Sequence, residues 1–158
     1  MSTPPIVSDV VPGLKGRGVI LADHTDLPDV ALALISAGYV VRELDGAHVV
    51  QRSQALPALA DALHLPGAAD HNLDALLDSL RDLPDLWPGR NGVVLLWRSA
   101  EQFIEGDPQV WEQIEQILTL ACLELAPNEF AFETVAFVEG YDLAPLLLGV
   151  PHDKGPVL

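Results

Sequence analysis

Apolar residues follow two kinds of pattern along the chain, and their alternation predicts an α/β fold. Short apolar runs at residues 18–22, 39–44, 93–97 and 132–138 are typical of buried strands. Between them, apolar residues recur three and four positions apart, which is typical of amphipathic helices. Strands that alternate with helices favour a mostly parallel sheet whose crossovers are right-handed.

Residues 71–83, HNLDALLDSLRDL, carry a clear helical signal. The leucines that share one face of this helix are Leu73, Leu76, Leu77, Leu80 and Leu83. Asn72 is placed to cap the helix, and Pro84 is placed to end it. The other side carries a stripe of acids, Asp74, Asp78 and Asp82. Like charges four residues apart repel by roughly 0.2–0.5 kcal/mol per pair, so the leucines explain the helix and the acids do not.

Helix starts are marked at two further places. Asp107 followed by Pro108 predicts the first residues of a long helix, because aspartate caps well and proline fits the first turn. Ser53 is predicted to cap a helix that runs to about Leu63.

The length of 158 residues and the apolar fraction of 49% predict a single domain, residues 1–158, with a substantial core. Within it, residues 1–16 are expected to form a loose N-terminal arm and residues 17–38 a strand–helix extension. Residues 39–139 form the central unit, and residues 140–158 a C-terminal tail.

The chain is strongly acidic, with 8 Lys+Arg against 23 Asp+Glu and a net charge of −15. Such a surface repels nucleic acid and acidic membranes and attracts basic proteins, although it could serve solubility alone. The apolar runs are too short for a membrane span, and no signal-peptide pattern opens the sequence. A single cysteine, Cys122, allows no internal disulfide and is expected to be buried. We therefore expect a cytoplasmic protein.

Candidate catalytic chemistry is sparse. The sequence has no phosphate loop, dinucleotide fingerprint, nucleophile elbow or zinc motif, so we expect no cofactor and no metal site. His24 lies in a DHTD stretch that is more typical of a solvated turn than of a metal site. Asp74 and Asp78 fall near the roughly 5–9.5 Å carboxyl spacing of glycosidases. Catalysis also needs a pocket that shifts one pKa, and these acids point away from the leucine face, so we expect a protein that is not an enzyme.

Four short segments follow one another in a characteristic order. They are YVVRELDGAH at 39–48, LP at 65–66, NLDALLD at 72–78 and VLLWR at 94–98. Their order is a strand with a D-G turn, a helix, an L-P loop, the N-L-D helix and a strand ending in W-R, and a long helix and a last strand follow. Together these segments resemble the barstar-like family of intracellular ribonuclease inhibitors, and the resemblance covers roughly residues 39–139.

The resemblance implies a barstar-like α/β domain with a three-stranded parallel sheet packed with helices, to which the strand–helix extension is added. In this family, the loop before the N-L-D helix and the exposed face of that helix plug the ribonuclease active site. Asp74 and Asp78 match the two helix aspartates that face phosphate-gripping basic residues, and Asn72 matches the cap. Carboxylates on a rigid helix would then present negative charge where RNA phosphates sit.

The predicted partner-binding surface departs from the family in its loop, GAADH at residues 67–71. Ala68 stands where the family has an aromatic residue, and Asp70, followed by His71, stands where it has a glycine. Leu77 replaces a tryptophan often found between the two helix aspartates. Aromatic anchors often dominate interfaces, so these changes favour a target other than the family's usual ribonuclease.

The long helix should supply one more acid to this surface. Glu115 and Glu124 are both candidates, and the sequence does not choose between them.

Two functional hypotheses follow. The first is a non-enzymatic inhibitor, of the immunity or antitoxin type, that binds a basic ribonuclease or related toxin. The alternative is a barstar-like scaffold reused as a protein-binding or dimerisation module, for instance as a homodimer, without ribonuclease inhibition. A small hydrolase that uses the acid stripe is the third and least favoured alternative.

Overall fold

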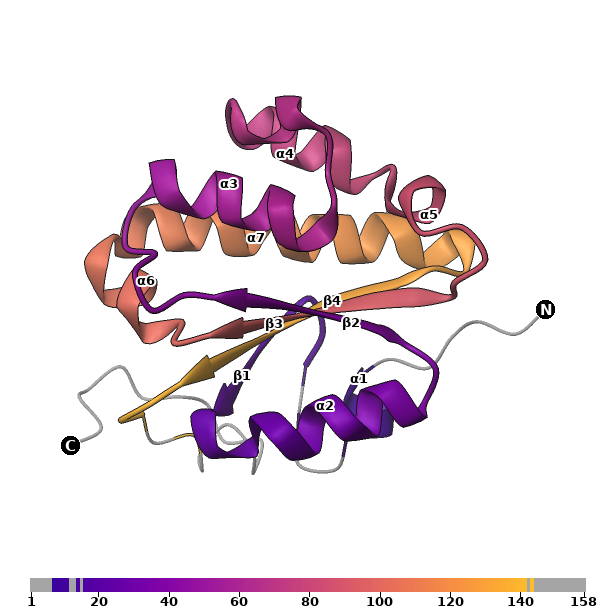
Figure 1. Cartoon of the computed structure of the whole chain (residues 1–158), viewed down its shortest axis with the longest axis horizontal. Helices are drawn as coiled ribbons and strands as arrows, with labels where there is room; N and C mark the ends of the chain where they lie inside the picture. The colour runs from indigo at the N-terminus through magenta and orange to yellow at the C-terminus, as the bar shows by residue number, and fades with distance from the viewer. Residues whose placement is uncertain (1–6, 12–13, 15, 142, 144–158) are drawn as a thin grey trace.

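The computed structural model describes residues 7–11, 14, 16–141 and 143. A parallel sheet lies between helices on both of its faces (Figure 1). Its strands are β1 (Val19–Asp23), β2 (Val40–Asp45), β3 (Gly92–Arg98) and β4 (Ala131–Val138). Their order across the sheet is β1-β4-β3-β2, and each neighbouring pair is parallel. The predicted α/β class is confirmed.

Two helical layers cover the sheet. One face carries α3 (Arg52–Leu63), α4 (Leu73–Leu80), α5 (Leu83–Leu86) and α7 (Pro108–Leu125). The other face carries α1 (Val7–Val10) and α2 (Leu27–Ser36), while α6 (Glu101–Gly106) links β3 to α7. Among the described residues, no helix combines the length and the apolar character needed to cross a membrane.

The sheet has four strands, which corrects the three expected from the resemblance. The predicted strand–helix extension is present as β1 and α2, and β1 pairs with β4, with Val19 opposite Thr134. Sequence patterns could not reveal this pairing, because it joins segments more than a hundred residues apart and leaves no local signature.

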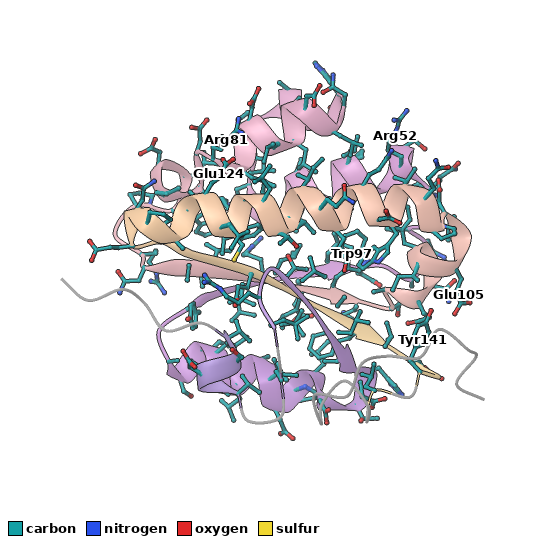
Figure 2. The ribbon with its side chains drawn as sticks, turned by 180° about the vertical axis from the view of Figure 1, so that it is seen from behind. Arg52, Arg81, Trp97, Glu105, Glu124 and Tyr141 are labelled. Atoms are coloured by element: carbon teal, nitrogen blue, oxygen red, sulfur yellow. The ribbon has the colours of Figure 1, made fainter. Side chains whose placement is uncertain are left out.

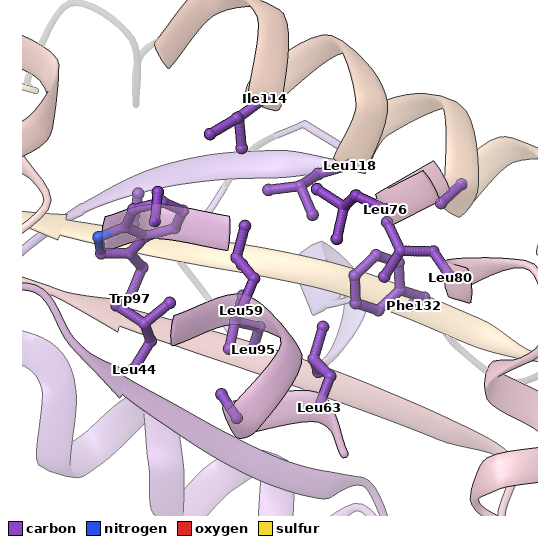
Figure 3. Close-up of a cluster of buried hydrophobic side chains, with 14 of the residues drawn as sticks. Leu44, Leu59, Leu63, Leu76, Leu80, Leu95, Trp97, Ile114, Leu118 and Phe132 are labelled. Atoms are coloured by element: carbon purple, nitrogen blue, oxygen red, sulfur yellow. The ribbon is translucent and has the colours of Figure 1, made fainter. Parts of the chain in front are cut away.

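The larger core lies between the sheet and the layer formed by α3, α4 and α7 (Figure 3). The fully buried side chains that fill it include Leu59, Leu63, Leu76, Leu80, Leu95, Trp97, Ile114, Leu118 and Phe132. Trp97 stacks on Phe103 with ring centroids 5.8 Å apart and meets Trp111 edge-on at 5.3 Å. This core fixes the position of α4.

A second core lies on the opposite face of the sheet, under α1 and α2. Val7, Val11 and Leu14 are buried there, so the described part of the predicted arm packs against the sheet instead of hanging free. Glu133 of β4 is also buried and accepts a hydrogen bond from the Val7 N–H at 3.2 Å. Burial raises the pKa of this carboxyl above its usual range. The rest of the predicted arm, and the predicted tail beyond residue 143, lie outside the described residues.

The D-G turn and the W-R strand end meet in space. The Gly46 N–H donates to the Arg98 carbonyl oxygen at 2.9 Å. A Cβ at position 46 would collide with that oxygen and would lie 2.7 Å from Nε1 of Trp97. The glycine is therefore required by this close approach of two strands.

Helix starts are confirmed at Asp107 and corrected at Ser53. The Asp107 carboxylate accepts a hydrogen bond from the Val110 N–H at 3.2 Å, and Pro108 opens α7. Ser53 lies inside the first turn of α3, which begins at Arg52 without a side-chain cap.

The helix predicted to run to Leu83 ends at Leu80, and a separate short helix, α5, follows. Pro84 accounts for the break, because it has no N–H to donate to the Leu80 carbonyl and its ring would collide with that group. Pro84 instead lies in the first turn of α5. Asp82 stands at the N-cap position of α5, so the acid stripe on α4 consists of Asp74 and Asp78.

Candidate protein-binding face on α4

The buried side chains on the inner face of α4 fix the position of this helix. Leu76 and Leu80 are fully buried against α7 and the sheet. The Asn72 Oδ1 atom accepts a hydrogen bond from the Ala75 N–H at 2.7 Å, which confirms the predicted cap. Asp74 and Asp78 are exposed as a consequence, one helical turn apart.

The loop before α4 lies beside this face. Its short 3-10 turn, Gly67–Asp70, packs against both α3 and α4 and buries Ala69. Ala68, Asp70 and His71 are exposed, with Nε2 of His71 4.0 Å from Oδ1 of Asp70. The predicted loop residues therefore lie beside the helix that carries the two aspartates.

Leu77 is half-buried and packs against the edge of the larger core. Part of its side chain is therefore taken up by packing against this core.

Asp78 has an intramolecular partner that the sequence reasoning overlooked. Nη1 of Arg81 donates to the Asp78 carboxylate at 2.9 Å. The same guanidinium bonds both carboxylate oxygens of Glu124 on α7, at 2.7 Å through Nε and 3.3 Å through Nη2 (Figure 2). These hydrogen bonds hold the pKa of Glu124 below its usual value. Asp78 is therefore paired within the chain: its i,i+3 spacing from Arg81 was visible in the sequence, but the partner of Arg81 on α7 was not.

Of the two acids considered on the long helix, Glu124 is the one tied to α4. Glu115 is half-buried, and its burial, followed by the neighbouring charge of Glu112, raises the pKa of its carboxyl.

A cluster that the sequence analysis did not predict anchors the start of the loop before α4. Nε of Arg42 donates to the Ala62 carbonyl at 2.7 Å, and Nε1 of Trp87 donates to the Leu63 carbonyl at 3.1 Å. His64, in the left-handed conformation that ends α3, stacks on Trp87 with centroids 4.8 Å apart. These contacts cap α3 from two distant segments and so set where the loop begins.

Metal binding finds no support in the described part of the chain, where no group of His, Cys, Asp and Glu side chains could hold an ion. In the DHTD stretch, Asp23 instead accepts hydrogen bonds from the backbone N–H and the hydroxyl of Thr25, as a turn residue does. Cys122 is buried as predicted, and burial raises the pKa of its thiol.

Comparison with known families decides the assignment. The model of the family described as barstar (barnase inhibitor) matches residues 39–136, more than half of the chain. The chain belongs to the barstar family. The match begins just before β2 and ends inside β4, so the barstar region contains α4 and the loop before it, while β1 and α2 precede it.

Other comparisons add little to the barstar assignment. No curated protein matches this chain. Among solved structures, a chain in the structure of Drosophila ORC bound to AT-rich DNA and Cdc6 is similar, with a TM-score of 0.47 and 17% identity. The likeness covers 88% of this chain but only 44% of that one, and it is too weak to bear on function.

Proposed function

We propose that this barstar-family chain is a non-enzymatic inhibitor, of the immunity or antitoxin type, that binds a basic ribonuclease or related toxin. The observation that carries this proposal is the placement of Asp74 and Asp78. Both carboxylates are exposed on a helix whose opposite face is fully buried, so they are displayed at a fixed spacing. A partner whose cationic cleft binds phosphates would meet two negative groups in their place.

Electrostatics favours a basic partner. The net charge of −15 would steer a cationic protein toward the chain and repel nucleic acid. Around the aspartates, Asp70 and His71 would add polar contacts, while Ala68 and Leu77 would supply only small apolar ones. With few aromatic anchors, the complex would depend strongly on charge and therefore on salt.

The test compares two double variants of equal charge. Asp74→Asn/Asp78→Asn removes the proposed phosphate mimics, and Asp26→Asn/Asp29→Asn removes two exposed acids at the start of α2. Each protein is used to inhibit RNA hydrolysis by barnase and by ribonuclease captured from the native extract. We expect the first variant to inhibit at least about 100-fold less well than wild type, and the second to remain within a few-fold.

Raising the salt from about 0.05 M to about 0.5 M should weaken wild-type inhibition, because the attraction between exposed charges is screened. Equal inhibition by both double variants would contradict the role of the α4 face. Capture of no ribonuclease, together with no effect on barnase, would contradict inhibition altogether.

The alternative, a barstar scaffold reused for protein binding or dimerisation, is favoured by one observation outside the α4 face. Leu32 and Ile35 of α2 are 65% and 58% exposed and lie one turn apart on the outer side of the second layer. Under this alternative, wild type would sediment as a dimer and Leu32→Ser/Ile35→Ser as a monomer. A wild-type monomer across the micromolar range would exclude this route to self-association.

A further inference from the structure

A single arginine already occupies part of the proposed binding face. Three nitrogens of the Arg81 guanidinium donate to two carboxylates from two helices, Asp78 on α4 and Glu124 on α7. The exposed fraction is 45% for the Arg81 side chain, 75% for Asp78 and 36% for Glu124, so a partner can reach all three. This arrangement is a guanidinium-binding site whose present occupant is part of the same chain.

We propose that Arg81 is an intramolecular competitor, which the arginine of a partner must displace in order to bond Asp78 and Glu124 together. This inference rests on the function proposed above and adds a competing group from within the chain. A cation approaching Asp78 meets the positive charge of Arg81 2.9 Å from the carboxylate oxygen. A guanidinium that bonds Asp78 and Glu124 together can do so only when Arg81 turns away, because Arg81 occupies both carboxylate oxygens of Glu124 and one of Asp78.

The contact is suited to exchange. Exposed ion pairs contribute little net free energy, so the Arg81 bridge can open without unfolding α4. An incoming arginine can reproduce the planar fork on Glu124 and Asp78, whereas a lysine ammonium cannot bond both carboxylates in the same geometry. Asp74 has no such internal partner among the described residues, so a second cation on the partner would bind there without competition.

The size of the effect follows from the occupancy of the bridge. When only a fraction of molecules has Asp78 free, the apparent dissociation constant rises by the inverse of that fraction. Removing Arg81 should therefore tighten the binding of an arginine-bearing ligand by about threefold to tenfold.

The experiment uses a tetra-arginine peptide at low salt, with binding followed by NMR shifts of the α4 backbone amides. Arg81→Gln is compared with Arg52→Gln, which removes the same charge from an exposed residue at the start of α3 (Figure 2). We expect Arg81→Gln to bind the peptide at least about threefold more tightly than Arg52→Gln. Equal affinities of the two variants for the peptide would overturn the proposal. The proposal would also be overturned if Arg81→Gln/Asp78→Asn still bound the peptide more tightly than Arg52→Gln by the same factor.

A second measurement needs no ligand. Carboxyl NMR titration should show the Glu124 pKa below its usual value in wild type and closer to that value in Arg81→Gln. An unchanged Glu124 pKa would show that the bridge does not form in solution and would overturn the proposal. Failure to inhibit any ribonuclease would contradict the proposed function alone, since neither measurement here uses a nuclease.

Discussion

The two faces of the sheet are covered by different parts of the chain, and the one under α1 and α2 buries an acid. α3, α4 and α7 cover one face, lie within the barstar match and display exposed carboxylates at Asp74 and Asp78. α1 and α2 cover the other face, precede the match and enclose the buried carboxyl of Glu133.

Because of this difference, the acids of the first face are expected to contribute to binding and the buried acid of the second face to stability. On the first face, leucines hold α4 in place while its acids stay in water and remain available to a partner. On the second face, Glu133 is buried and accepts a hydrogen bond from the Val7 N–H, so it affects folding and is not accessible to a partner. Substitutions on the two faces should therefore give different combinations of stability and binding.

The largest effect is expected from a matched pair of core leucines. Leu76→Ala on the first face and Leu34→Ala on the second each remove a fully buried side chain. Each should lower the free energy of unfolding by about 3 kcal/mol, measured by urea denaturation. At a temperature where both variants remain folded, only Leu76→Ala should weaken the proposed ribonuclease inhibition, because it loosens α4. Equal loss of inhibition from Leu34→Ala would remove the distinction between the faces.

Substitution of Asn72 tests whether an exposed residue of the α4 face also contributes to the free energy of unfolding. Loss of its hydrogen bond to the Ala75 N–H in Asn72→Ala should lower the free energy of unfolding by about 1 kcal/mol. Asn72→Ser keeps a capping oxygen and serves as the control, with most of the stability retained in thermal or urea denaturation. A serine variant as unstable as the alanine variant would contradict the capping role.

Glu133 should give a smaller effect that depends on pH. Because burial raises its folded pKa, the folded state keeps a proton that the unfolded state loses above the usual glutamate pKa. Wild-type stability should therefore fall as pH rises from that value through the raised folded pKa. Glu133→Gln retains an oxygen for the Val7 N–H and should lack this fall. Parallel pH profiles for the two proteins, measured by urea denaturation, would show that Glu133 does not titrate in this way.

The smallest effect on stability is expected from substitution of Arg81, and it should disappear as the pH falls. The lowered pKa of Glu124 contributes stability above the usual glutamate value, and this contribution is lost as pH falls through the lowered folded pKa. Arg81→Gln should be slightly less stable than wild type near neutral pH and equal to it in acid, with Arg52→Gln as the control. A difference that grows toward acid pH would contradict the assigned cause.

Much of the fold and part of the site could be predicted because their causes are local. The spacing of Leu76 and Leu80 predicted which face of α4 is buried, and the caps at Asn72 and Asp107 depend on groups three residues away. A helix period and a cap are set by neighbours along the chain, so one sequence is enough to read them.

Where helix α4 ends was predicted less well, because two local signals compete there. The leucine period continues to Leu83, which is indeed buried, while Pro84 interrupts the backbone hydrogen bonds. Burial of Leu83 did not require one continuous helix, and the break removed Asp82 from the acid stripe.

The sequence by itself determined the alternation of strands and helices, the buried face of α4, its cap and the acids on its outer side. Only the tertiary structure decided that β1 joins β4, that Gly46 touches the Arg98 carbonyl, and that Arg81 reaches Glu124 across 43 residues. Each of these contacts joins segments that no local period relates. Their geometry is fixed by how the sheet and its two layers pack as a whole, and that packing brought Glu124 to the arginine that Asp78 already meets within its own helix.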